Sequence, residues 1–174
     1  MAVSKTHPTE RIRAAYAGGI RVFGENRVQE FSGKADSLLD LVQAEWHMIG
    51  HLQSNKAAKA AELFAAVDSL DSIKLADRLN SAAEQENKKI PVLIEINVGG
   101  EESKSGVPPE SRDLEDLLQS VPRFAALQFR GLMTVPPFSD DAQGARPYFR
   151  RLRELRDSIA RRKLPGISME VLSM

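Results

Sequence analysis

The sequence predicts an α/β fold of parallel strands, either an incomplete TIM-type (β/α)₈ barrel of about seven strands or an open doubly wound sheet. Short apolar runs alternate with helical periodicities from one end of the 174-residue chain to the other. Several runs are nearly continuous, as in "PVLIEINV", which is typical of parallel strands covered by helices. No shift in composition divides the chain, and we therefore expect residues 1–174 to form a single domain.

The predicted strands are the apolar runs bounded by polar or turn-forming residues. In chain order they are Ala2–Ser4, Arg21–Phe23, Trp46–Ile49, Ala66–Leu70, Val92–Val98, Phe129–Thr134 and Ser168–Leu172.

Between the strands, apolar residues recur at helical spacing. These segments predict helices within residues 9–19, 26–42, 54–66, 72–87, 109–121 and 145–163. Thr9 and Ser54 are the expected N-caps of the first and third helices, and Gly18 and Gly19 are expected to end the first. The second helix is expected to bury one apolar face, made of Val28, Phe31, Leu38, Leu39 and Val42.

Composition excludes several classes of protein. Lysine plus arginine and aspartate plus glutamate both number 24, so the chain lacks the basic excess typical of nucleic-acid binding. The absence of cysteine excludes disulfides, cysteine-ligated metals and thiol nucleophiles. No apolar run approaches the roughly 20 residues that span a membrane, and no signal peptide is evident. We expect a cytoplasmic protein with no membrane partner.

Polar residues follow the predicted strands, at the edge where parallel α/β folds place their sites. They are Lys5, Glu25, Asn26, Gly50, His51, Asp71, Asn97, Thr134 and Ser173. A lysine among neutral hydrogen-bonding groups suits an imine-forming site, because burial beside apolar groups favours the neutral, nucleophilic amine. The alternatives are that Lys5 is a solvated loop lysine, that Asn26 caps a helix together with Gln29, and that Glu25 is a loop carboxylate.

Two other motifs do not meet the requirements of the sites they suggest. His47 and His51 are four residues apart, but the segment has Met48 where a zinc protease has glutamate, and it is predicted as a strand. The stretch "GGEESKSG", residues 99–106, lacks the lysine–serine pair of a Walker phosphate loop. We expect this stretch to be a mobile surface loop.

Several segments together resemble one known family. "AVSKTHP", "FGENRVQE", "WHMIGHLQSNK", "DSLDSIKLADRLN", "VLIEINVGGEESKSG", "RGLMTV" and "LSM" occur in order and cover the whole chain. In this respect the sequence resembles the pyridoxal-phosphate homeostasis protein family.

This resemblance implies a fold like the N-terminal barrel of alanine racemase, with pyridoxal 5'-phosphate (PLP) held as a Schiff base on Lys5. It also implies that Asn26, Ile49, Ser173 and Met174 line the cofactor, with Val3 and Met133 as apolar walls. Family members are not known to catalyse a reaction, so the resemblance implies a protein that binds or stores PLP or delivers it to PLP-requiring apoenzymes. The resemblance also implies a monomer. The alternatives are a PLP-dependent enzyme such as an amino-acid racemase, which would need a second domain, and an interaction module without cofactor.

The family pattern also extends beyond both ends of these residues. A helix usually precedes "AVSK", and a segment after "LSM" usually supplies backbone donors for the phosphate and an arginine for the pyridine nitrogen. For the 174 residues alone we therefore expect unpaired edges on the first and last strands and weaker PLP binding than in a longer relative.

Overall fold

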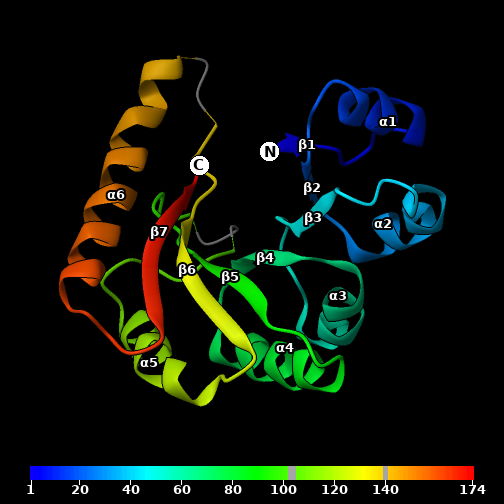
Figure 1. The fold of residues 1–174 in the computed structure, drawn as a ribbon. Coiled ribbons are helices and arrows are strands. Elements are labelled where there is room, and N and C mark those ends of the chain that lie inside the picture. The colour runs from blue at the N-terminus through cyan, green and yellow to red at the C-terminus, as the bar shows by residue number, and fades with distance from the viewer. Residues whose placement is uncertain (102–104, 139–140) are drawn as a thin grey trace.

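The computed structural model describes residues 1–101, 105–138 and 141–174. Its strands form one sheet of seven, in the order in which they occur in the chain (Figure 1). The strands are Ala2–Val3 (β1), Val22–Glu25 (β2), Glu45–Met48 (β3), Ala66–Leu70 (β4), Ile90–Glu95 (β5), Leu127–Met133 (β6) and Ile167–Ser173 (β7).

Helices connect the strands and cover the outside of the sheet (Figure 1). They are Thr9–Ala17 (α1), Val28–Ala35 (α2), Ala57–Leu63 (α3), Ile73–Gln85 (α4), Arg112–Ser120 (α5) and Arg146–Arg161 (α6). Every neighbouring pair of strands is parallel. A doubly wound sheet would reverse its strand order part-way, so the unbroken sequential order shows an incomplete barrel. The predicted barrel is confirmed.

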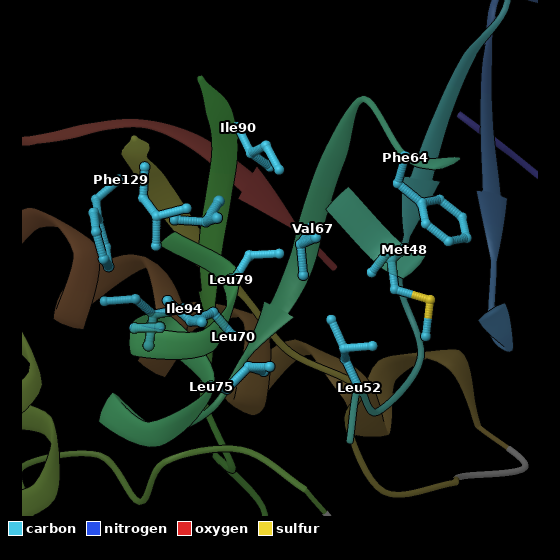
Figure 2. Packing of buried hydrophobic residues seen from close by; sticks show 14 of the residues in the cluster. Met48, Leu52, Phe64, Val67, Leu70, Leu75, Leu79, Ile90, Ile94 and Phe129 are labelled. Atoms are coloured by element: carbon cyan, nitrogen blue, oxygen red, sulfur yellow. The ribbon is translucent and has the colours of Figure 1, made fainter. Parts of the chain in front are cut away.

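The main core lies between the sheet and the helices. Figure 2 shows side chains of β3, β4, β5 and β6 packed with Leu75 and Leu79 of α4. On the β3 side, the ring of Trp46 lies 4.7 Å from that of Phe31 and 5.0 Å from that of Phe23, measured between centroids. One continuous cluster of buried apolar residues extends from Ile12 in α1 to Met169 in β7.

Some predicted helix ends and faces are wrong. Pro8 occupies the N-cap of α1, without a side-chain hydrogen bond, so Thr9 is the first helical residue. Ser54 begins a 3₁₀ turn, Ser54–Lys56, and α3 follows from Ala57. A 3₁₀ helix of residues 36–38 also replaces the end of the second predicted helix.

That change of helix type redirects the apolar side chains after α2. Leu38 and Leu41 are buried, whereas Leu39 and Val42 are 74% and 85% exposed. A 3₁₀ turn has three residues per turn, so the α-helical spacing that placed Leu39 and Val42 inward no longer applies.

The barrel is open between β1 and β7, the two edge strands of the sheet. A cavity of about 520 Å³ lies inside, lined by β3 to β7 and by both chain ends, Met1 and Met174. The N and C labels in Figure 1 lie close together beside this opening. No helix in the described part of the chain is long and apolar enough to cross a membrane.

Candidate functional site

Lys5 lies in a tight turn directly after β1. The N–H of His7 donates to the carbonyl of Ser4 at 3.1 Å, which closes the turn around Lys5 and Thr6. Thr6 has a φ of 62°, a left-handed conformation that is uncommon for a β-branched residue. Lys5 itself is exposed, so its amine can be reached from solvent at the carboxyl end of the strand.

The residue before Lys5 is anchored in the protein interior. Ser4 is buried, its N–H donates to the carbonyl of Gly24 at 2.9 Å, and its hydroxyl donates to Glu25 Oε1 at 2.6 Å. Glu25 ends β2 and is fully buried, which corrects its interpretation as a loop carboxylate.

A second lysine completes this arrangement. Lys34 of α2 places Nζ 2.8 Å from Glu25 Oε1, and the two side chains are 12% and 0% exposed. Buried charges are rarely found without a partner, and this ion pair neutralises both groups. The sequence prediction missed Lys34, although a lysine nine residues after the "GE" of β2 sits on an amphipathic helix that must pack over that strand.

Val3, which the resemblance gives as an apolar wall of the site, and Ile49, which it gives as lining the cofactor, lie on the inner face of the barrel. Val3 pairs with Gly24, and a Cβ on Gly24 would meet Ile49 Cδ1 at 2.7 Å. The absence of a side chain at Gly24 therefore leaves room for Ile49 across β2.

Asn26 follows β2 and is half-buried. Its backbone lies so close to Gly50 that a Cβ on Gly50 would collide with it. Asn26 does not cap α2, because Arg27 holds the N-cap position.

Met133 and Ser173 belong to the other side of the barrel. The register pairs Glu95 with Met133 and Met133 with Ser173, so these residues form a row across β5, β6 and β7. Thr134 directly follows Met133, and its N–H donates to the carbonyl of Ser173 at 3.0 Å. Met133 is buried, and Met174 is exposed at the end of the chain.

Glu95 is a buried carboxylate that the sequence prediction missed. It is 6% exposed, and burial raises its pKa, with a further rise from the nearby charge of Asp71. A hydrogen bond from Ser105 Oγ to Glu95 Oε1, at 3.0 Å, and the proximity of His51 lower the pKa in part. The available signal was a glutamate inside the apolar run "VLIEINV", because a residue within a continuous apolar strand is expected to be buried together with its neighbours.

The predicted site residues thus form separate groups. Lys5, Val3, Asn26 and Ile49 lie at β1 to β3, and Met133, Ser173 and Met174 lie at β6 and β7. The cavity of about 520 Å³ is lined by Ser173 and Met174 on one side and by Met1 on the other, while Lys5 lies outside this lining. The structure therefore places the groups on opposite sides of the barrel opening.

His47 and His51 have separate acidic partners. His47 Nδ1 lies 3.1 Å from Asp68 Oδ1, and His51 Nδ1 lies 3.1 Å from Asp71 Oδ2. Among residues 1–101, 105–138 and 141–174, no group of three or more histidine, cysteine, aspartate or glutamate side chains could hold a metal ion. The predicted loop of residues 99–106 includes residues 102–104, which lie outside the described residues.

A family model described as the alanine racemase N-terminal domain matches residues 1–173. The chain is also 45% identical over 172 residues to the pyridoxal phosphate homeostasis protein of Aquifex aeolicus, covering 97% of this chain and 74% of that protein. The chain belongs to the pyridoxal phosphate homeostasis protein family. The human protein of that name is 38% identical over 183 residues, covering 98% of this chain and 65% of its own.

Solved structures agree with membership of the pyridoxal phosphate homeostasis protein family. PipY of Synechococcus elongatus PCC7942, solved with PLP bound, is 36% identical with a TM-score of 0.88, covering 100% of this chain and 79% of PipY. Alanine racemase from Streptomyces coelicolor A3(2) is 20% identical with a TM-score of 0.78, covering 99% of this chain and 46% of the racemase. The likeness to the racemase shows a shared fold alone.

Proposed function

We propose that this protein binds PLP in vitamin B6 homeostasis, with Lys5 as the covalent anchor. The observation that carries the proposal is the placement of Lys5, an exposed amine whose preceding residue is buried and hydrogen-bonded to the next strand. This geometry fits an amine that must be both accessible and fixed in position. The structure of PipY with PLP bound supports the PLP-binding part of the proposal.

The remaining site residues suit the parts of PLP. Val3, Ile49 and Met133 offer apolar surface to a pyridine ring, and the amide of Asn26 offers hydrogen bonds to ring substituents. Ser173, the last residue of β7, and Met174 after it are the proposed contacts from the other side of the barrel opening. When bound, PLP supplies an aldehyde with which a lysine amine can form a covalent bond.

A spectrum with added PLP, followed by borohydride reduction and peptide mass mapping, tests the anchor. We expect a visible absorption band and a single pyridoxyl-labelled peptide that contains Lys5. Lys5→Arg keeps the positive charge but should lose the band and the label, whereas Lys59→Arg, at an exposed site on α3, should keep both. Labels spread evenly over surface lysines in the unmutated protein would contradict the proposal.

We also propose that the protein carries PLP without catalysing a reaction. The support is the name borne by its relatives, which refers to homeostasis. An amino-acid racemisation assay with PLP present should show no turnover beyond that of free PLP. Turnover that Lys5→Arg abolishes would instead establish the racemase alternative.

The proposed partners are PLP and the apoenzymes that require it. We propose that the protein acts as a monomer in the cytoplasm, with residues 1–174 as one PLP-binding barrel domain. Mixing the PLP-loaded protein with a PLP-requiring apoenzyme should activate that enzyme. Size-exclusion chromatography with light scattering should give the mass of one chain, 19.2 kDa.

A further inference from the structure

We propose that Glu25, Glu30 and Lys34 form a positioning set that fixes the backbone on both sides of Lys5. The inference rests on the proposed function and deepens it, because it concerns how the anchoring lysine is presented. None of these residues is proposed to touch PLP.

The side that precedes Lys5 is held through Ser4. Its hydroxyl donates to Glu25 Oε1 at 2.6 Å, and its carbonyl accepts from Lys34 Nζ at 3.3 Å. The hydroxyl and the carbonyl of Ser4 therefore contact the same ion pair, and the carbonyl also accepts the turn-closing bond from the N–H of His7. A rotation of the peptide that joins Ser4 to Lys5 would break the contact with Lys34.

The side that follows Lys5 is held through Thr6. The N–H of Thr6 donates to Glu30 Oε1 at 2.7 Å, a short bond to a charged acceptor. The φ of Thr6 is 62°, which threonine adopts only where its surroundings impose it. Glu30 supplies such a constraint from α2, which lies 24 residues further along the chain.

Lys34 links the two sides. Its Nζ lies 2.8 Å from Glu25 Oε1 and 3.9 Å from Glu30 Oε1, and its side chain is only 12% exposed. The Lys34 ammonium group thus lies near both the carboxylate of Glu25, which accepts from Ser4, and the carboxylate of Glu30, which accepts from Thr6. The lysine side chain at position 5 is long and exposed, so a fixed backbone is the means available to limit where its amine can reach.

The test compares how fast borohydride traps PLP on Lys5, relative to a surface lysine, in variants of Glu30. Glu30→Ala removes the acceptor of the Thr6 N–H and should lower this ratio on the order of tenfold to a hundredfold, as expected when a reacting group is misplaced. Glu30→Gln keeps an oxygen acceptor and should restore most of the ratio. Glu62→Ala is the matched control, because Glu62 is a helical glutamate paired with a lysine, at 51% exposure, on α3.

An independent readout is amide hydrogen exchange and the backbone order parameter at Lys5 and Thr6, measured by NMR without PLP. Glu30→Ala should speed exchange at Thr6 and lower the order parameter of Lys5, with the melting temperature changed no more than in Glu62→Ala. Either unchanged exchange at Thr6 or an unchanged labelling ratio in Glu30→Ala would overturn the positioning inference.

The two proposals fail in different ways. If the unmutated protein takes no label on Lys5, the proposed function fails, and the NMR comparison alone then decides the positioning inference. If Lys5 is labelled normally in Glu30→Ala, the function stands and the inference is wrong. Ser4→Ala, which removes the hydroxyl bonded to Glu25, gives a second, milder variant with the same expected direction.

Discussion

Glu95 is a carboxyl group that the folded protein removes from water. It is 6% exposed, and its Oε2 is buried without a hydrogen-bond partner within the described residues. Removal of a carboxylate from water disfavours its charged form, which is why burial raises the pKa of Glu95. The folded state therefore binds its proton at pH values where the unfolded chain has released it.

This difference sets a pH dependence of stability. The pKa of Glu95 is higher in the folded state than in the unfolded chain, where it is about 4.5. The contribution of Glu95 to the free energy of unfolding is therefore greatest below pH 4.5, and it falls as the pH rises through the folded pKa. Glu95→Gln should therefore raise the free energy of unfolding at pH 8, by about 0.5–2 kcal/mol. It should have less effect near pH 4.

Urea unfolding of both proteins across this pH range measures the difference. Glu154→Gln, at an exposed position on α6, should leave the profile unchanged. A profile for Glu95→Gln parallel to that of the unmutated protein would show that Glu95 carries no such linkage.

At the same scale, sequence reasoning located Lys5 but not the groups around it. A lysine after the first apolar run is visible in the sequence, and so are the motifs shared with a family. The bond from Thr6 to Glu30 spans 24 residues, and its existence depends on how α2 packs over β1 and β2. Such contacts arise from tertiary packing, which local periodicity does not encode.

Among the elements, β6 and β7 lie too close together at Gly131 for a side chain to fit between them. Gly131 lies where the register between these strands shifts, and a Cβ there would collide with the carbonyl oxygen of Val171. Gly33, in α2, has nothing within 4 Å of the same position. The two glycines therefore have opposite roles, one required by packing and one a weak point of a helix.

Alanine substitutions should separate these roles. Gly131→Ala should lower the free energy of unfolding by about 1–3 kcal/mol or more, because backbone cannot yield as a flexible side chain can. Gly33→Ala should raise it by about 0.5–1 kcal/mol, since alanine favours a helix. Thermal unfolding by circular dichroism measures both, and an unaffected Gly131→Ala would show that β7 can shift away from β6 at little cost.

The sequence predicted the elements well except where helix type changed. Each predicted strand overlaps an observed one, because short apolar runs bounded by turn-forming residues are typical of strands. The prediction that Leu39 and Val42 were buried is wrong because a 3₁₀ segment follows α2, and apolar spacing alone does not distinguish one helix type from the other.

For the whole molecule, one apolar cluster joins the two halves of the barrel. Phe129 of β6 is 2% exposed and belongs to the same cluster as Phe23 and Phe31, which pack against Trp46. The chain contains a single tryptophan, so its fluorescence reports on the β1 to β3 side. If the barrel unfolds as one unit, a destabilising substitution at Phe129 must also shift the unfolding transition that Trp46 fluorescence reports.

Phe129→Ala should therefore lower the free energy of unfolding by about 3–5 kcal/mol. The urea midpoints measured by Trp46 fluorescence and by circular dichroism should fall together. Phe138→Ala is the control, because Phe138 is 91% exposed. If the fluorescence midpoint stayed in place while circular dichroism shifted, the β1 to β3 side would be a separate unit and the single-domain proposal would fail.

The architecture followed from the sequence only in part. Alternation of strands and helices predicted a parallel α/β fold but left open a doubly wound sheet, because apolar patterns do not specify strand order. The resemblance to a family selected the barrel, and the sequential strand order confirmed it.

The opening of the barrel brings the two chain ends to one cavity, since Met1 and Met174 both line it. A short flexible linker should therefore join them, and new termini could be opened at a surface turn such as Gly18–Gly19, giving a circularly permuted barrel. An affinity tag fused to either end of these 174 residues would, by the same geometry, lie at the mouth of the lumen. Tags for PLP-binding measurements on this chain are therefore better removed by protease before the titration.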